Sequence, residues 1–318
     1  MDSLSIKLYG QVDIYSKIES FCEASFRSPQ YSIETDSLSE FNEVYRVFYN
    51  NKKYIVKHTA FYNPISLIRA NKQFAESIYR VTKQTHNHTK RLALPEYLRY
   101  EVNDFGVFYL MHETQLKRLP PEEADLVMLG EALSEFHISF TNNDSGMIIL
   151  PWNHFSPEFR AIFVENKRWD VVSSFLKNYY PGNEYFSNNL IVNHNDIHAG
   201  NIFLSNSRYM FLDLNEISLA DPLNDLGIIV ANYIINPTIE GDELDNKLSL
   251  LLSGYYRSQK MTVSTKQRQM IYIFALRKLF LIEGYFLYSG YKRNNYNTTF
   301  IQWLRDSQSN ITKYIEKL

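Results

Sequence analysis

The sequence predicts an α+β fold of two lobes, a small β-rich N-terminal lobe and a larger helical C-terminal lobe. Segments rich in β-branched and aromatic residues occupy the first third of the chain, at residues 31–35, 43–49, 53–59, 95–100 and 106–111. Long amphipathic segments dominate the last third, at residues 244–256, 265–288 and 300–317. The pattern changes near residues 111–119, so we expect one lobe at residues 1–112 and the other at residues 113–318.

Local signals place the other elements in order. A helix is expected before the first strand, because apolar residues recur at every third position between residues 12 and 21. Asn50-Asn51 predicts a tight hairpin, since Asn tolerates a positive φ. Pro64 is expected to open a helix that ends near Lys83, and Pro120-Pro121 to precede a helix over residues 122–140. Short strands are expected at residues 190–192, 202–204 and 209–212.

The bulk composition excludes several classes of protein. The formal net charge is −2, so no global basic field favours nucleic acid or an anionic membrane surface as a partner. Cys22 is the only cysteine, which excludes an intrachain disulfide and favours a reducing compartment. Neither a signal-peptide core nor a bilayer-spanning apolar run is recognisable. We therefore expect a cytoplasmic protein, and the sequence leaves its oligomeric state open.

The most informative segment is residues 194–201, His-Asn-Asp-Ile-His-Ala-Gly-Asn, followed by Phe211-Leu212-Asp213. Asp196 lies in a predicted loop between strands, where its carboxylate is expected to orient a substrate hydroxyl and to take its proton late. The amide oxygen of Asn201 and the carboxylate of Asp213 suit Mg²⁺, which prefers oxygen ligands. These residues predict phosphoryl transfer from ATP or GTP to a small-molecule hydroxyl acceptor. An Asx-rich turn is the alternative, but it does not account for the ordered array.

Three further residues are expected to support this loop. His194 is interpreted as a packing and hydrogen-bonding residue, and His198 as a residue that positions Asp196 or Asp213. Both histidines could instead be purely structural, and the metalloprotease pattern H-E-x-x-H is absent. Asp225 is either the N-cap of an apolar helix or a buried carboxylate that accepts backbone N–H groups of the catalytic loop.

A lysine in a predicted strand completes the nucleotide end of the site. Lys57 follows Tyr54-Ile55-Val56, and a kinase needs one strand lysine at the α- and β-phosphates. Glu76, on the following helix, is the expected ion-pair partner of Lys57. No glycine occurs between Gly10 and Gly106, so the usual Gly-rich phosphate cradle is absent.

Other groups are expected to contact the rest of the nucleotide. Ser39 and Asn42, which precede the strand at residues 43–49, are interpreted as replacement donors for the phosphates. The linker Met111-His112-Glu113 is expected to present backbone groups of Met111 and Glu113 to the purine edge. We therefore expect residues 1–112 to bind the nucleotide and residues 113–318 to carry the catalytic loop and the acceptor pocket.

These motifs resemble the aminoglycoside phosphotransferase and choline kinase superfamily, over about residues 30 to 290. The family pattern is His-Gly-Asp-x-His-x-x-Asn, then Ile/Leu-Asp-Phe/Trp-Glu/Asp, then Asp-Pro-x-x-Asp. This chain has the corresponding residues 194–201, 212–216 and 221–225, and residues 44–47 resemble the family's second strand. The resemblance implies a protein-kinase-like fold, Asp196 as catalytic base, Asn201 and Asp213 as magnesium ligands, and Lys57 with Glu76 as the phosphate-positioning pair.

The chain departs from that pattern at two places. Asn195 replaces the usual Gly, and Leu214-Asn215 replaces the aromatic–acid pair, with Glu216 displaced along the chain. Only twelve positions separate Asp213 from Asp225, too few for the activation segment on which protein kinases bind a peptide.

The leading functional hypothesis is a kinase of an aminoglycoside-like or other amine-bearing antibiotic. Acidic residues of the helical lobe would bind such an acceptor; the candidates are Glu158, Glu165, Asp170, Glu184, Glu240, Asp242, Glu243 and Asp245. The alternative is a metabolic kinase of choline, homoserine or a methylthio sugar, since a choline-like acceptor needs an aromatic cage. The cage candidates are Trp152, Trp169, Tyr255, Tyr256 and Trp303. A catalytically inactive nucleotide-binding protein is the third hypothesis, which the presence of base, metal ligands and lysine opposes.

Overall fold

The computed structural model divides into two compact units. It describes residues 14–34, 43–60, 72–85, 89–104, 106–141, 147–149, 157–179, 190–257, 263–293 and 297–318. The N-terminal unit comprises residues 1–117, 139–148 and 204–215, and the C-terminal unit comprises residues 118–138, 149–203 and 216–318. The assignment of residues 1–112 to nucleotide binding and of residues 113–318 to the acceptor stays a prediction.

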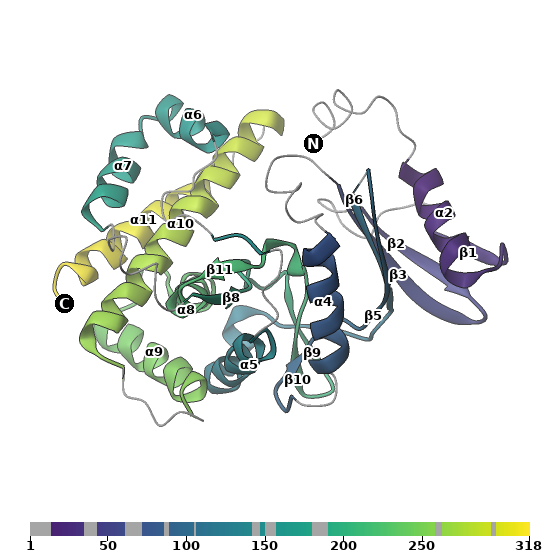
Figure 1. The fold of residues 1–318 in the computed structure, drawn as a ribbon. Helices are drawn as coiled ribbons and strands as arrows, with labels where there is room; N and C mark the ends of the chain where they lie inside the picture. The colour runs from purple at the N-terminus through teal and green to yellow at the C-terminus, as the bar shows by residue number, and fades with distance from the viewer. Residues whose placement is uncertain are drawn as a thin grey trace. The chain divides into compact units, whose positions relative to one another are not determined.

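An antiparallel five-stranded sheet forms the centre of the N-terminal unit (Figure 1). Its strand order is β1-β2-β3-β6-β5. The bounds are β1 Tyr31–Ile33, β2 Glu43–Tyr49, β3 Lys52–Ala60, β5 Tyr97–Asn103 and β6 Gly106–His112. Asn50 and Asn51 join β2 to β3 with φ of 48° and 58°. Positive φ at both positions is the mark of a type I′ turn, which confirms the predicted hairpin.

Helix α2, Ile14–Phe26, covers one face of this sheet. Its residues Ile18, Phe21 and Cys22 pack against apolar side chains of the strands, among them Val56 and Phe108. Successive side chains of a strand point to opposite faces. Lys57, which follows Val56, therefore points to the face opposite α2.

Helix α4, Lys72–Thr85, lies beside β5, where the hydroxyl of Tyr79 donates to the carbonyl of Leu98 at 3.2 Å. The short strand β4, Leu92–Ala93, pairs in parallel with β10, Arg208–Phe211, and β9, Ile202–Ser205, lies next to β10. The later strand β10 thus joins the N-terminal unit and carries the segment that ends at Asp213.

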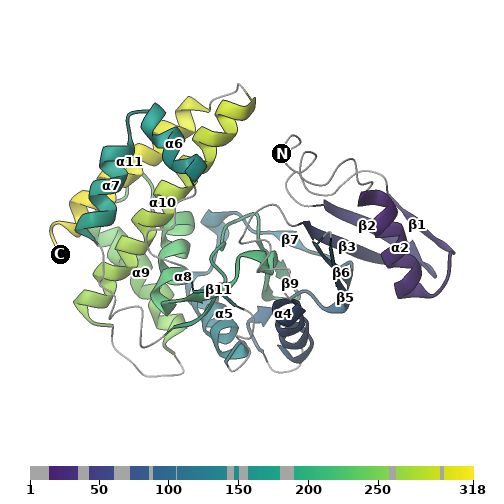
Figure 2. The same cartoon turned by 45° about the horizontal axis from the view of Figure 1, so that its top comes forward.

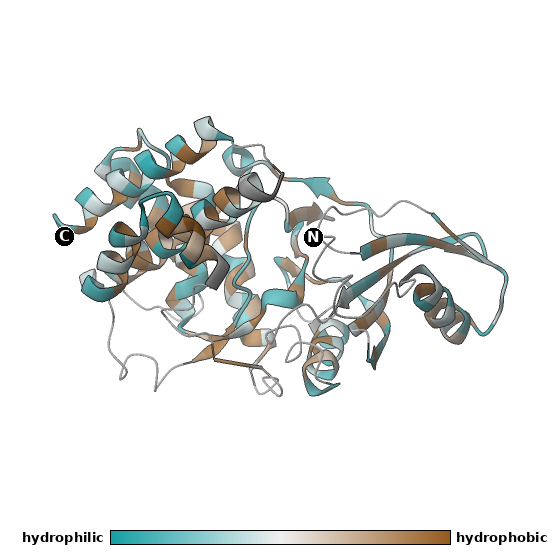
Figure 3. Ribbon diagram, turned by 90° about the horizontal axis from the view of Figure 1, so that it is seen from above, coloured by the Kyte–Doolittle hydropathy of each residue, from teal (hydrophilic) through white to brown (hydrophobic). Residues whose placement is uncertain are grey.

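Seven α-helices belong to the described part of the C-terminal unit. Their bounds are α5 Leu126–Ser139, α6 Pro157–Glu165, α7 Trp169–Asn178, α8 Pro222–Ile229, α9 Gly241–Tyr255, α10 Thr265–Arg293 and α11 Thr298–Ile315. Figures 1 and 2 show α10 as a long diagonal helix, and it packs against α6, α8 and α11. Hydrophobic and hydrophilic residues are mixed along these helices (Figure 3).

Shorter elements complete the two units. They are β7 Lys117–Arg118, β8 Ile191–Asn193, β11 Ser218–Ala220, 3₁₀ turns at Pro121–Glu123 and Leu214–Glu216, and a π-helical turn at Val230–Ile234. The helix predicted from residue 122 begins at Leu126, because the 3₁₀ turn precedes it. The helices predicted near residues 1 and 64 are described only from Ile14 and Lys72. None of the helices in the described ranges combines the length and hydropathy needed to cross a bilayer.

Helices α5 and α9 approach each other through two glycines. A Cβ added to Gly254 would lie 1.9 Å from the carbonyl oxygen of Val127, and one added to Gly130 would lie 2.1 Å from that of Leu251. Because both partner atoms are backbone, no side-chain rotation relieves such a contact. The absence of Cβ at these positions therefore sets the spacing of the two helices.

Candidate active site

The loop between β8 and β9 presents Asp196 with donors at both carboxylate oxygens. Oδ2 accepts a hydrogen bond from Nδ2 of Asn201 at 2.8 Å and lies 3.3 Å from Nε2 of His198. Oδ1 lies 3.0 Å from Nζ of Lys278. Burial opposes ionisation here, but the charge of Lys278 and the hydrogen bond from His198 hold the pKa of Asp196 well below its usual range. Asp196 is therefore a carboxylate at neutral pH.

Asn201 is buried and oriented by the same loop. Its amide nitrogen also donates to the carbonyl oxygen of Asp196 at 3.0 Å. Among the described residues, the amide oxygen of Asn201 has no hydrogen-bond partner. This amide oxygen, which is the predicted metal-binding atom of Asn201, is thus available to a ligand.

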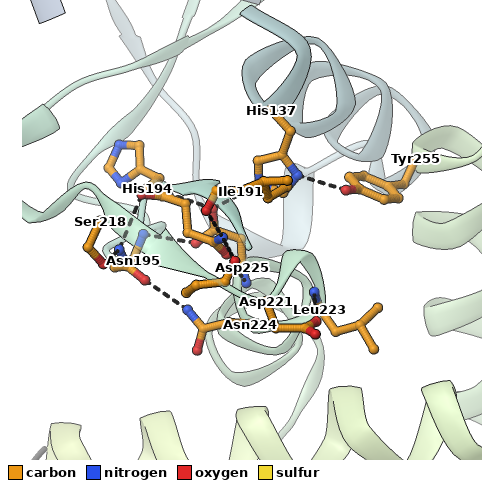
Figure 4. Close-up of polar contacts among 12 residues, drawn as sticks. His137, Ile191, His194, Asn195, Ser218, Asp221, Leu223, Asn224, Asp225 and Tyr255 are labelled. Carbon is orange, nitrogen blue, oxygen red and sulfur yellow. Dashed lines mark hydrogen bonds and ion pairs between the residues drawn. The ribbon is translucent and has the colours of Figure 1, made fainter. Parts of the chain in front are cut away.

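Asp225 accepts hydrogen bonds from the backbone of the loop (Figure 4). This fully buried carboxylate accepts the N–H of His194 at 2.6 Å and that of Asn195 at 2.8 Å. It also lies 3.1 Å from Nε2 of His137, whose Nδ1 lies 2.7 Å from the hydroxyl of Tyr255. Of the two interpretations of Asp225, the buried acceptor is the observed one.

The N-cap of α8 is instead Asp221, whose side chain accepts the N–H of Leu223 at 2.7 Å. This capping bond places Asp225 in the first turn of the helix, where it faces the loop rather than the helix terminus.

The residue that replaces the family glycine adopts a left-handed conformation. Asn195 has φ of 64°, a value that Asn tolerates better than most residues. Its amide nitrogen lies 2.9 Å from the carbonyl oxygen of Glu216 and 2.8 Å from Oγ of Ser218, and its amide oxygen accepts from Asn224 at 2.8 Å. Asn195 therefore keeps the backbone geometry of a glycine and adds hydrogen bonds that a glycine lacks.

Replacing Asn195 separates these two contributions. Asn195→Gly keeps the left-handed backbone but loses the side-chain bonds, so we expect a loss of about 1–2 kcal/mol in the free energy of unfolding. Asn195→Val adds the strain of a β-branched residue at positive φ, a further cost of about 1–2 kcal/mol. Urea unfolding of both variants measures the difference. Equal stability of the two variants would contradict the assigned conformation.

The two histidines of the motif contact the loop in different ways. Nδ1 of His194 accepts the N–H of Asp196 at 3.3 Å, and its ring packs against Phe136 with centroids 5.6 Å apart. His198 contacts the Asp196 carboxylate through Nε2 while its Nδ1 accepts the N–H of Gly200 at 3.0 Å. These contacts place His194 under the loop backbone and His198 against the carboxylate.

In the N-terminal unit, Lys57 pairs with Asp213. Nζ of the buried Lys57 lies 2.6 Å from Oδ1 of Asp213. A buried ammonium needs a nearby opposite charge, and this carboxylate provides it. The predicted Lys57–Glu76 ion pair is not formed among the described residues, so that part of the prediction is wrong for this structure. The reason is the phase of α4, which exposes Glu76 and buries Phe74, Ala75, Ser77 and Ile78.

Comparison with known proteins identifies the chain. The family model described as "Phosphotransferase enzyme family" matches residues 39–255, more than half of its length. The chain belongs to the phosphotransferase enzyme family. In a search of curated proteins, no sequence matches.

Solved structures share the fold of this phosphotransferase. A choline/ethanolamine kinase family protein from Mesorhizobium loti has a TM-score of 0.61 at 14% identity, with 95% of each chain covered. An amicoumacin kinase in complex with AMP-PNP and Ca²⁺ has a TM-score of 0.60 at 13% identity, covering 96% of this chain and 95% of that one. The gentamicin complex of APH(2″)-IIa has a TM-score of 0.57 at 14% identity, covering 96% and 97%. The predicted kinase-like fold and superfamily are confirmed.

The phosphotransferase has donor atoms that suit magnesium. Asn201 offers an amide oxygen and Asp213 offers a carboxylate, the oxygen chemistry that Mg²⁺ prefers alongside phosphates and water. No cluster of three or more His, Cys, Asp or Glu side chains with metal-binding geometry occurs in the described ranges. Magnesium binding by Asn201 and Asp213 stays a prediction.

The second departure from the family pattern also has a structural role. Nδ2 of Asn215 donates to the hydroxyl of Thr59 at 2.9 Å. Thr59 is two residues from Lys57 on β3, so both side chains point to the same sheet face. The Lys57–Asp213 and Thr59–Asn215 contacts together fix the segment after β10 on that face. No pattern of residues predicted this pairing, because the partners are 156 positions apart.

The purine-edge residues lie at the end of β6. Met111 pairs with Ile55 of β3, and the N–H of Glu113 donates to the carbonyl of Lys53 at 3.1 Å. The Glu113 carboxylate lies 2.8 Å from Nε of Arg46. The backbone donor of Glu113 is therefore used within the unit, and the nucleotide-binding role of Met111 stays a prediction. Ser39 and Asn42 lie outside the described residues.

Sequence reasoning missed Lys278. This α10 residue contacts Asp196 from 82 positions away. One signal was available: residues 271, 274, 275 and 278 follow the spacing of a single buried helix face, and a lysine is unusual on such a face.

Proposed function

We propose that this phosphotransferase moves the γ-phosphate of ATP or GTP to a hydroxyl of an amine-bearing antibiotic of the aminoglycoside type. The observation that carries the transfer step is the Asp196 carboxylate, ionised and held at both oxygens. Such a group is a weak base but a good hydrogen-bond acceptor for a hydroxyl. It suits a loose transition state, in which the acceptor proton leaves late.

The donor end of the reaction would use Lys57, Asn201 and Asp213. The Lys57 ammonium is the cation of the sheet that would contact the nucleotide phosphates. Asn201 and Asp213 would hold magnesium, which when bound neutralises charge on the phosphate oxygens. The solved structures of the same fold include complexes with ADP, GDP and AMP-PNP, which supports a nucleotide donor.

Removing the Asp213 carboxylate tests the donor end. Asp213→Ala deletes a metal ligand and leaves the buried Lys57 ammonium without its partner. We expect magnesium–nucleotide affinity to fall at least about tenfold, the effect of about 1.4 kcal/mol. Isothermal titration with the magnesium complex of a non-hydrolysable ATP analogue measures it. Glu101→Ala, at a partly exposed residue of β5 that pairs with Arg99, is the matched control. Unchanged affinity of Asp213→Ala would contradict the assigned role.

Contacts inside the C-terminal unit bear on the acceptor. Several aromatic candidates for a choline cage have other partners: Trp169 lies under the Arg160 guanidinium at 5.0 Å, and Trp303 stacks on Phe300. The ring of Tyr255 contacts His137. These three rings therefore already have partners within the C-terminal unit. Trp152 lies outside the described residues.

Four of the acidic candidates divide into two groups, and Glu184 lies outside the described residues. Asp245 accepts from the hydroxyls of Tyr272 and Tyr314, and Glu243 pairs with Lys247. Glu165 and Asp170 are exposed on α6 and α7, where they remain available to a cationic acceptor. Solved structures of the same fold include a gentamicin complex, a spectinomycin phosphotransferase and an amicoumacin kinase, which supports an antibiotic acceptor. A cytoplasmic location stays a prediction from the sequence.

A panel experiment tests the proposal. The protein is incubated with magnesium and ATP or GTP, and with gentamicin, spectinomycin, choline or homoserine as acceptor. Transfer is read as nucleotide consumption and as a mass gain of about 80 Da on the acceptor, one phosphoryl group. Turnover of choline or homoserine alone would favour the metabolic alternative. Thermal stabilisation by nucleotide without turnover on any acceptor or on water would favour an inactive nucleotide-binding protein.

A further inference from the structure

Helix α10 brings a lysine onto the catalytic loop. Nζ of Lys278 lies 3.0 Å from Oδ1 of Asp196 and 3.3 Å from the carbonyl oxygen of Asn195. The Lys278 side chain is only 14% exposed. It therefore contacts both the carboxylate and the backbone of the loop, in surroundings that screen the charges weakly.

The placement of Lys278 is fixed by the packing of α10 on α8. Gly227 of α8 faces the backbone of Ile271 and Ala275 and the Cβ of Phe274 so closely that an added Cβ would lie 2.4 Å from the last of these. Lys278 lies one helical turn beyond Phe274, on the same face of α10. A helix held so closely by its neighbour presents Lys278 to the loop with little freedom.

The contacts of Asp196 show what Lys278 adds. Asn201 and His198 both approach Oδ2, and among the described residues Lys278 is the donor at Oδ1. Without Lys278, the carboxylate would be fixed at one oxygen and free to turn about it. With Lys278, a charge-assisted bond fixes the second oxygen as well, and the plane of the carboxylate is set.

We propose that Lys278 is a positioning residue for phosphoryl transfer, which fixes the Asp196 carboxylate at the angle from which it orients the acceptor hydroxyl. The proposal rests on the proposed function, because Asp196 must contact the acceptor. It assigns to α10 a direct part in the reaction, besides its part in the fold. Misplacement of a reacting group by about 1 Å costs on the order of 10²-fold in rate.

A loss-and-rescue experiment tests the proposal on the full-length enzyme. Lys278→Met and Lys278→Cys are assayed with the best acceptor of the panel, or by ATP hydrolysis with water as acceptor. We expect kcat to fall about 10²-fold, with the KM for nucleotide within about twofold of the unmodified protein. Alkylation of Lys278→Cys with 2-bromoethylamine then rebuilds a lysine-like ammonium, and we expect it to restore most of the lost kcat.

The chain offers its own controls. Cys22 is fully buried, and burial raises the pKa of its thiol to about 12, so the same treatment should leave the parent protein unchanged. Lys247→Met removes a partly exposed lysine of α9 that pairs with Glu243, and it should leave kcat unchanged. Thermal unfolding shows which variants are folded, and Lys278→Gln replaces Lys278→Met if the latter is not.

The outcomes separate the two proposals. If the parent protein transfers no phosphate to any acceptor or to water, the proposed function fails, and the role of Lys278 fails with it. If the parent protein is active and folded Lys278→Met keeps kcat within about twofold, the role of Lys278 alone is overturned. A purely structural role predicts lost stability without rescue of kcat by aminoethylation, and that result also overturns it.

Discussion

Asp196→Ala is expected to lower phosphoryl transfer by about 10²–10⁴-fold, the usual contribution of a positioned base. The Asp196 carboxylate is ionised and held by Asn201 and Lys278, so its removal deletes the acceptor for the substrate hydroxyl. Initial rates at saturating nucleotide and acceptor give the change in kcat. Nucleotide affinity, measured by isothermal titration, should stay within about threefold, a change under 1 kcal/mol.

Asp196→Asn is the matched control, because it keeps the shape and removes the charge. It too should lose most of the activity, since an amide accepts a hydrogen bond more weakly than a carboxylate. Turnover of Asp196→Ala equal to that of the parent protein would remove the mechanism. A loss confined to nucleotide affinity would indicate that Asp196 acts on the nucleotide rather than on the acceptor hydroxyl.

Asp225→Ala is expected to destabilise the protein by about 3–5 kcal/mol, because it removes a buried acceptor that three groups share. The substitution leaves the N–H groups of His194 and Asn195 and the ring of His137 without their shared acceptor. Each is a donor in the protein interior, where an unpaired polar group costs about 1–3 kcal/mol. Urea unfolding measures the loss, and activity should fall with it because the loop carries Asp196.

Tyr255→Phe provides the control for Asp225→Ala. It removes only the outermost hydrogen bond, between the Tyr255 hydroxyl and His137, and keeps the ring. We expect a cost of about 1 kcal/mol. Similar losses in the free energy of unfolding for both variants would show that Asp225 does not stabilise the loop.

The course of the loop between β8 and β9 was predictable because its signals are local in sequence, and its catalytic role stays a prediction. Asp196 and Asn201 lie five positions apart in one loop, and the short strands on either side were visible as apolar runs. The hairpin at Asn50-Asn51 was predictable for the same reason, since two adjacent residues determine the turn. Where one short segment sets the geometry, residue types and spacing suffice.

The partners of Lys57, Asp196 and Asn215 were not predictable in this way. The ion pair of Lys57 depends on where the segment after β10 lies against the five-stranded sheet. Spacing along the sequence instead favoured Glu76, which is nearer to Lys57 in the chain. The phase of α4, which turns Glu76 to solvent, follows from packing that involves the whole unit. Lys278 reaches Asp196 only because α10 packs on α8 at a glycine. Contacts of this kind are set by tertiary packing, which a single sequence does not reveal.

The glycine contact between α5 and α9 has a consequence for the loop. Gly254 is the neighbour of Tyr255, and Gly130 lies two turns before His137 on α5. The closeness of these two backbones brings the Tyr255 hydroxyl within reach of the His137 ring, and His137 in turn contacts Asp225. Even a single methyl group introduced at either glycine would push the helices apart and weaken the contacts that run from Tyr255 through His137 to Asp225. Damaging substitutions are thus expected at residues that contact no substrate, wherever the backbones of two helices must approach closely.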